Sequence, residues 1–291
     1  GNSMMLRLAM RMTKADAASA QAWAVKAISG GTMTSNDHLA AVTHTDGPEG
    51  INKNGHGEVF DVDSQMRMSA TFGAHLANDP RLSVLFSPGS SNTVIVGMPN
   101  GSTSDTYVGT DGVTVPGVTD RHVYAQTHPA LRGKDVPMVF QTYAEVEFLK
   151  AEAAIRGWIS SSAEEHYNKG VTAAMKMLKQ LYPASTAITN AEISAYLAGP
   201  GAYDASKGWE MAMNEYWKAT FLNEYEAYSN WRRTGYPTLV PTKHPNSVSN
   251  NQIFRRMIYP GGESATNGDN YAAAVARQGA DDFTTRMWWD K

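Results

Sequence analysis

The chain has 291 residues, a mass of 31.6 kDa and no cysteine, which excludes disulfides, thiol catalysis and cysteine-ligated zinc. Its formal net charge of −3 at pH 7 provides no basic field for phosphate backbones, so we expect no nucleic-acid partner. No run of about 18 apolar residues is present, so no segment is expected to span a bilayer.

The first 30 residues are expected to form two helices. Asp16 stands where it can cap the second helix, which runs to Ile28 and ends at a Gly-Gly pair. Because Gly1 enters a helix without a signal peptide, we interpret the chain as a piece of a longer protein, with a natural cytoplasmic start as the alternative. The first helix, residues 3–14, is predicted to be amphipathic, with Met5, Leu8, Ala9 and Met12 on one face and Arg7, Arg11 and Lys14 opposite.

Residues 32–60 are rich in Asp, Asn, Gly and His and predict a long, turn-rich surface loop. Its histidines, His44 and His56, match no metal-ligand spacing, so we interpret them as solvated turn residues, with metal ligation as the lesser alternative. Residues 66–77 predict another helix, and residues 82–86 predict a buried strand or short helix.

Residues 87–137 read as an irregular insert dominated by Gly, Ser, Thr and Pro. Residues 94–97 resemble a strand, and an Asp-Gly turn at 111–112 joins short extended pieces. An aromatic side chain without apolar neighbours at strand or helix spacing is a poor core candidate, so we expect display at the surface. The competing interpretation is that each tyrosine packs under its own loop. The side chains in question, together with one arginine, are Tyr107, His122, Tyr124 and Arg132.

Two Ala-rich stretches, residues 141–158 and 163–180, predict antiparallel helices joined by a short loop. Ser162 can cap the second helix, and Glu152 and Arg156 form a favourable i,i+4 pair in the first. The two helices resemble one tetratricopeptide-type unit, although the chain shows no fixed period of about 34 residues. Residues 190–197 predict one more short helix.

The strongest pattern lies in residues 207–239, where large apolar side chains recur at steps of three and four. This spacing predicts a single helix of about six turns with an aromatic stripe on one side. Each aromatic side chain buries roughly 150–250 Å², so we expect the stripe to be the largest hydrophobic contribution in the protein. The stripe comprises Trp209, Met213, Tyr216, Trp217, Phe221, Tyr225, Tyr228 and Trp231.

Arg232 and Arg233 follow this stripe at the predicted end of the helix, where a cation suits the helix dipole and a guanidinium can clamp a carboxylate. We expect one of them to pair with a buried carboxylate; the alternative is an anion pocket for a substrate. The carboxylates considered are Glu147, Glu152 and Asp290.

The last part of the chain is expected to be mostly loop, with a short helix at 271–278. The chain ends in Trp288-Trp289-Asp290-Lys291. Because chain ends usually fray, a tryptophan pair at this position predicts that the tail docks back onto the body.

Three runs carry a family resemblance: N-E-Y-E-A-Y-S-N-W-R-R-T-G-Y-P from 223, R-R-M-I-Y-P-G-G-E from 255 and R-M-W-W-D from 286. They resemble the C-terminal half of the SusD/RagB family of surface glycan-binding lipoproteins, in the branch that ends in Trp-Trp-Asp. The resemblance implies a mainly α fold, a tetratricopeptide-type helical scaffold with a large irregular insert of loops and short strands. It also implies one SusD-like domain fragment over 1–291, whose parent's N-terminal half is absent. Its parts would be a helical segment at 1–86, the insert at 87–137 and a C-terminal helical region at 138–291.

The resemblance further implies non-catalytic capture of an oligosaccharide or other nutrient for delivery to a SusC-like TonB-dependent transporter. The protein would face outward from the outer membrane as a lipoprotein, through a lipidated N-terminus not in this chain. In this family some glycan contacts come from aromatics of the insert, so the resemblance marks Tyr107, His122, Tyr124 and, in the same region, Arg132 as candidate ligand residues. No cofactor or metal is implied. Structural roles are expected for Trp217, Trp231, Arg232, Arg233, Trp288 and Trp289.

Two other functions remain open from the residues alone. A helical scaffold for protein contacts is favoured if the insert tyrosines are buried. An α-helical glycosidase needs two carboxylates roughly 5–9.5 Å apart across a cleft, and Glu224 would be its general acid if burial in the stripe raised its pKa. A buried Glu paired with Arg is the commoner outcome, and no hydrolase, zinc-protease, P-loop or dinucleotide motif is present, so we expect no enzyme. Residues 61–64 and 267–270 could supply oxygens to a calcium ion, but neither has the spacing of a known calcium loop, so we interpret them as loop-capping residues.

Overall fold

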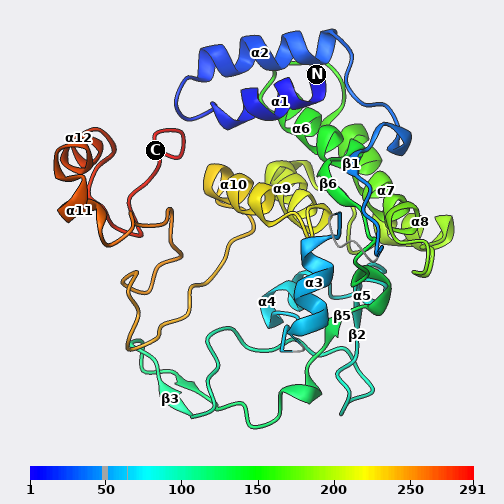
Figure 1. Cartoon of the computed structure of the whole chain (residues 1–291). Coiled ribbons are helices and arrows are strands. Elements are labelled where there is room, and N and C mark those ends of the chain that lie inside the picture. Colours follow the sequence, from blue (N-terminus) through cyan, green and yellow to red (C-terminus); the bar gives the residue numbers. More distant parts are fainter. Residues whose placement is uncertain (48–51, 64) are drawn as a thin grey trace.

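The computed structural model describes residues 1–47, 52–63 and 65–291 (Figure 1). The middle of the loop predicted at 32–60 and the last residue of the calcium candidate at 61–64 lie outside these described residues. Helices dominate the described chain, and its strands form three short antiparallel pairs rather than one sheet. The fold is therefore mainly α, as predicted.

Helix α6, Tyr143–Ile155, lies at the centre of the helical body. It packs against α7 (Ala163–Leu181), α9 (Gly208–Ala219) and α1 (Asn2–Arg11). Nine of its 13 residues are buried, so it is surrounded on almost every side. A Cβ at Gly170 of α7 would stand 2.6 Å from the Phe148 ring, so this glycine permits the close approach of α6 and α7. The core is therefore centred on an Ala-rich helix and not on the aromatic stripe.

Two helix caps, one intrahelical ion pair and one short helix of the helical body agree with the predictions. Asp16 accepts a hydrogen bond from the Ser19 amide at the start of α2, Ala17–Ser29, and Ser162 accepts one from the Glu165 amide at the start of α7. Glu152 and Arg156 form the predicted i,i+4 ion pair. Helix α8, Asn190–Ala198, begins with a capping box.

The predicted faces of α1 are wrong. Leu6, Ala9 and Met10 are buried, whereas Leu8 is 57% exposed. Arg7 and Arg11 turn toward the protein instead of toward solvent. They do so because buried carboxylates lie opposite them, and a long arginine stem can pack against apolar surface while its head finds a partner.

The single long helix predicted at 207–239 is also wrong. Helix α9 ends at Ala219, α10 (Glu224–Thr234) begins after four intervening residues, and Leu222 among them has a φ of +64°. Thr220 donates its hydroxyl to the Tyr216 and Trp217 carbonyls, and Asn223 donates to the Val139 carbonyl, so local and tertiary hydrogen bonds replace the helical ladder. The break turns Tyr225 outward, where it is 83% exposed.

The insert and its surroundings contain small helices and strands, some where the sequence predicted an element, as within 66–77 and 82–86, and others where it predicted loop. The Asp-Gly turn at 111–112 joins two strands as predicted, with Gly112 at a φ of +77°, while residues 94–97 form no strand. Strands β1 (Ala40–Val42) and β6 (Met138–Gln141), β2 (Phe86–Ser87) and β5 (Gln126–Thr127), and β3 (Tyr107–Val108) and β4 (Thr114–Val115) are the three pairs. The helices of this part are η1 (Asn36–His38), α3 (Gly55–Val62), α4 (Ala70–His75), α5 (Leu82–Leu85), η2 (Arg121–Val123) and η3 (Pro129–Leu131).

The C-terminal tail docks onto the body, as predicted. Asp290 is fully buried, and the Trp289 ring lies between the guanidinium groups of Arg11 and Arg232. Trp288, in contrast, is 58% exposed. The remaining elements are η4 (Ala205–Lys207), α11 (Glu263–Thr266) and α12 (Gly268–Gln278). Within the described residues, no helix has both the length and the apolar composition that a membrane crossing requires.

Candidate functional site

Four aromatic rings from distant parts of the sequence meet where the insert joins the helical scaffold. Phe72 of α4 lies at the middle, with its ring centroid 4.8 Å from Trp217 and 5.3 Å from Phe221. Phe86 of β2 completes the set, 5.8 Å from Phe72 and 5.2 Å from Phe221. We call these four residues the aromatic cluster.

A pocket of about 260 Å³ opens over this cluster. We call it the aromatic pocket. Phe60 of α3, Met66 and Met68 add further apolar walls, while Arg67 and Glu224 contribute charged side chains. Trp217 and Phe221 keep part of their surface accessible, so the pocket offers aromatic surface to a bound molecule. Apolar walls with a few polar groups are typical of small-molecule sites.

Tyr107 lies on the β3–β4 hairpin at the outer end of the insert, away from β5 (Figure 1). It is half-buried, its hydroxyl donates to the Gly101 carbonyl at 3.3 Å, and its ring lies 4.7 Å from the His244 ring. His122 and Tyr124, by contrast, lie in and just after η2, directly before β5. The structure therefore does not bring Tyr107 together with the other candidate ligand residues.

His122 is exposed and its Nδ1 lies 3.2 Å from the Ser90 hydroxyl, whereas Tyr124 is half-buried. Neither tyrosine of the insert is buried, so the condition that favoured a scaffold for protein contacts alone is not met.

Arg132 lies in a groove that shares one wall residue with the aromatic pocket. It lines a polar groove of about 470 Å³ together with Lys134, Asp61 and Phe60, and Phe60 also lines the aromatic pocket. Burial and the nearby positive charge of Arg67 lower the pKa of Arg132. Among the described residues none accepts a hydrogen bond from Arg132 Nε.

Glu224 does not meet the expectation for a general acid. It begins α10 after the break, and its side chain is 62% exposed and lies 3.2 Å from His56 Nε2. The hydrogen bond from His56 lowers the pKa of Glu224, whereas a general acid needs a raised pKa. The same hydrogen bond raises the pKa of His56.

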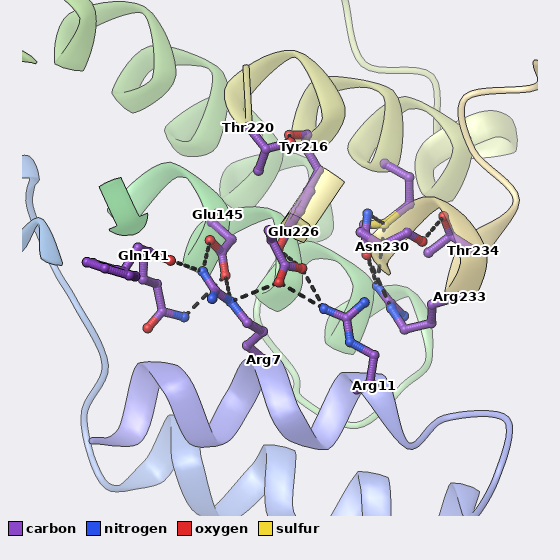
Figure 2. A network of polar contacts seen from close by, with 12 residues as sticks. Arg7, Arg11, Gln141, Glu145, Tyr216, Thr220, Glu226, Asn230, Arg233 and Thr234 are labelled. Atoms are coloured by element: carbon purple, nitrogen blue, oxygen red, sulfur yellow. Dashed lines mark hydrogen bonds and ion pairs between the residues drawn. The ribbon is translucent and has the colours of Figure 1, made fainter. Parts of the chain in front are cut away.

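The buried carboxylates on the inner side of α1 are held by arginines (Figure 2). Arg7 Nε donates to Glu145 at 2.6 Å, and Arg11 donates to both oxygens of Glu226 at 2.7 and 2.9 Å. Tyr216 also donates its hydroxyl to Glu226, at 2.8 Å. Burial raises the pKa of Glu145 even though Arg7 opposes this shift. These carboxylates serve helix packing, since their oxygens are already committed to neighbouring cations.

A second buried charge cluster comprises Asp79, Arg81, Glu215 and Lys218, with Tyr196. Arg81 donates to Asp79 Oδ1 at 2.9 Å and to Glu215 at 2.6 Å. Lys218 and the Tyr196 hydroxyl both donate to the other Glu215 oxygen. In this cluster, too, the carboxylates are paired with buried cations, whereas a glycosidase needs two carboxylates that face a substrate across a cleft.

Arg233 forms the predicted buried pair, with Glu152, while Arg232 lies over the Tyr228 and Trp289 rings and donates to the Arg255 carbonyl. Both arginines are thus part of the packing rather than of an anion pocket. Trp231 is buried and lies under the Arg255 guanidinium.

Several pocket residues were missed from the sequence. Phe60, Phe72 and Phe86 were read only as parts of a loop, a helix and a strand, and nothing in their spacing links them to one another.

The described residues contain no group of three His, Asp or Glu side chains suited to a metal ion. His44 instead contacts the Asn52 carbonyl.

Comparison with known proteins gives consistent matches. Residues 1–260 match a protein family described as starch-binding and associating with the outer membrane. A solved structure titled "chitin-binding protein" is 32% identical with a TM-score of 0.84, and the match covers 99% of this chain and 63% of that one. A structure titled "Bacteroidetes AC2a SusD-like" is 27% identical with a TM-score of 0.84, covering 100% and 68%. A chitin-binding SusD homolog from Flavobacterium johnsoniae, 24% identical with a TM-score of 0.75 over 100% of this chain and 62% of that one, shares the fold.

The chain therefore spans about 63% of the length of the first of these structures. None of the curated proteins matches it. The helical fold with short strands is the one that these structures share, which confirms the predicted architecture.

Proposed function

This chain belongs to the SusD-like family of starch-binding proteins that associate with the outer membrane, and from that premise we propose that it captures an oligosaccharide without altering it chemically. The observation that carries the proposal is the aromatic pocket, where Trp217 and Phe221 offer accessible ring surface between the insert and the scaffold. Aromatic rings contact the apolar face of a sugar, while polar groups around them bind its hydroxyls.

The four candidate ligand residues do not lie together, so they would contact different parts of a bound glycan. Arg132 lines the neighbouring groove, which shares Phe60 with the pocket, so a glycan that extends from the pocket into this groove would meet the Arg132 side chain. We propose that His122 and Tyr124, which lie within the insert, make further contacts with the glycan. Tyr107, which lies beside His244 on the outer hairpin, would contact only a long or branched ligand. Residues 87–137 would thus act as one insert displayed on the helical scaffold at 1–86 and 138–291.

For the ligand, the relative titled "chitin-binding protein" makes chito-oligosaccharides the first compounds to test, and the family description makes starch-derived oligosaccharides the second. We further propose that the protein faces outward from the outer membrane as a lipoprotein and delivers its ligand to a SusC-like TonB-dependent transporter.

The test is a titration of the protein with chito-, malto- and cello-oligosaccharides in which tryptophan fluorescence and reaction products are followed together. Saturable fluorescence change without new products is the expected result. New products would support the glycosidase instead, and no response to any oligosaccharide would support the protein-contact scaffold. Transporter delivery needs its own test, namely co-purification with a TonB-dependent transporter from an outer-membrane extract.

A further inference from the structure

We propose that the aromatic pocket receives the acetamido group of an N-acetylated sugar, so that the captured glycan is one built from N-acetylhexosamine. This inference rests on the proposed function and names the chemical group that this site selects. It follows from the chemistry of the pocket wall rather than from its aromatic content alone.

Of the polar side chains that line the pocket, Thr220, Ser69 and Arg67 already make hydrogen bonds within the protein, which leaves Thr127 and Glu224 as the others. Thr220 already donates to two carbonyls, and Ser69 donates to Asn100 and accepts from the Thr71 amide. Arg67 donates to the Arg121 and Met66 carbonyls. A sugar hydroxyl placed inside would lose its water and find few replacements, and an unsatisfied buried polar group is unfavourable. The pocket therefore suits a part of the ligand that is apolar.

The size of the pocket sets a second limit. Its volume of about 260 Å³ lies below the range of about 300–1,000 Å³ usual for drug-sized ligands. It can hold one substituent together with part of one ring, but not a chain of sugars. The methyl of an acetamido group is an apolar part of many glycans, and it fits a wall of Phe72, Phe86 and Phe221 side chains.

The mouth of the pocket supplies a partner for the amide. Glu224 is more than half exposed there, and its carboxylate can accept the acetamido N–H. His56 keeps this carboxylate ionised, because their hydrogen bond lowers the pKa of Glu224. A charged acceptor makes a stronger hydrogen bond than a neutral one. Cellulose-type sugars carry a hydroxyl at this position and so lack both the methyl and the N–H.

The test compares three tetrasaccharides with the same β-1,4 backbone: fully N-acetylated chitotetraose, cellotetraose and the de-N-acetylated glucosamine tetramer. Isothermal titration calorimetry should give at least about tenfold tighter binding for chitotetraose, from one buried methyl and one charge-assisted hydrogen bond. Equal affinity for chitotetraose and cellotetraose would overturn the inference while leaving carbohydrate capture intact. If the glucosamine tetramer bound as tightly as chitotetraose, the selectivity would come from the Glu224 charge. This result would overturn the inference as well. Absence of binding to all three would count against the proposed function itself.

Two variants locate the effect. Ala227 lines the pocket from α10, so Ala227→Leu should fill it and reduce the preference for chitotetraose over cellotetraose to about twofold or less. Ala276→Leu makes the same change at an exposed position of α12 outside the pocket and should leave the preference unchanged. Met66→Ala should enlarge the pocket and improve binding of an N-propionylated tetramer relative to the N-acetylated one. Unchanged selectivity in both pocket variants would overturn the assignment to this pocket.

Discussion

The Arg233 guanidinium and the Glu152 carboxylate form a doubly hydrogen-bonded ion pair, with both nitrogen–oxygen distances at 2.7 Å and both side chains buried. Arg233 also donates to Asn230 at 2.8 Å, and Arg156 shares the Glu152 carboxylate. Burial opposes ionisation, but the two arginines together lower the pKa of Glu152. The pair fastens α10 to the central helix α6.

Removing one partner of this pair should strongly destabilise the protein. Arg233→Met leaves Glu152 with only the half-exposed Arg156, and we expect a loss of about 3–5 kcal/mol in the free energy of unfolding, measured in urea. The double variant Arg233→Met, Glu152→Met should lose less than the sum of the two single changes, because no uncompensated charge remains. Lys169→Ala, which breaks an exposed pair with Glu165, is the control and should leave the urea midpoint unchanged. Unchanged stability in Arg233→Met combined with lost glycan binding would assign the arginine to a ligand site instead.

Acid should destabilise the protein through Glu215. Burial would raise its pKa, but Arg81 and Lys218 lower it to about 2, from an ordinary value of 4.5. Because the folded-state pKa is depressed, the ionised carboxylate stabilises the protein above pH 4.5, and this contribution of about 3 kcal/mol is lost as the pH falls toward 2. Glu152 and Glu147 shift in the same direction.

Urea unfolding at a series of pH values between 7 and 2.5 measures this loss. Glu215→Gln should be less stable at pH 7 and should show a shallower decline in the acid range. A variant that declines as steeply as the parent would show that other carboxylates carry the acid sensitivity.

The tail should contribute to stability through Asp290. This buried carboxylate accepts from Lys14 at 3.3 Å, from Arg255 at 3.4 Å and from Arg286 at 3.2 Å. Since the three cations are partly exposed, Asp290→Ala should cost about 1–3 kcal/mol rather than the full penalty of a buried charge. It should also make the peptide bonds after Arg286 and Arg277 more sensitive to trypsin. Asp269→Ala in exposed α12 is the matched control, and equal trypsin sensitivity in both variants would contradict a docked tail.

The sequence predicted those elements whose signals are local. Helices α6, α7 and α8 carry their own caps and Ala-rich spacing, and Ser162 and Asp16 cap where the pattern indicated. The Asp-Gly turn likewise depends only on neighbouring residues. The three sequence runs that resemble the SusD/RagB family then indicated the architecture, which residue spacing alone did not determine.

Features that depend on distant partners were not predictable in this way. The stripe at 207–239 has helical spacing throughout, yet Asn223 bonds to Val139 and the chain turns at Leu222. The buried face of α1 depends on Glu145 and Glu226, which lie far along the chain. The aromatic pocket combines α3, α4, β2 and the helix break, so its existence is a property of the fold and not of any one segment.

Arg132 should affect binding without affecting folding. Its Nε is buried and, within the described part of the chain, unsatisfied, so the free protein already carries the cost of a desolvated donor. Replacing Arg132 by Ala removes that cost, and the melting temperature should stay within about 2 °C of the parent. Affinity for a glycan that extends beyond the aromatic pocket should fall by about tenfold or more, since a hydrogen bond from a charged donor contributes about 1.5–3 kcal/mol. Lys134→Ala is the control, because Lys134 lines the same groove but is already paired with Asp61 at 2.6 Å, and its loss should change affinity by less than about threefold. If Arg132→Ala instead lowered the melting temperature and left affinity unchanged, the arginine would be a packing residue, and the ligand would be confined to the aromatic pocket.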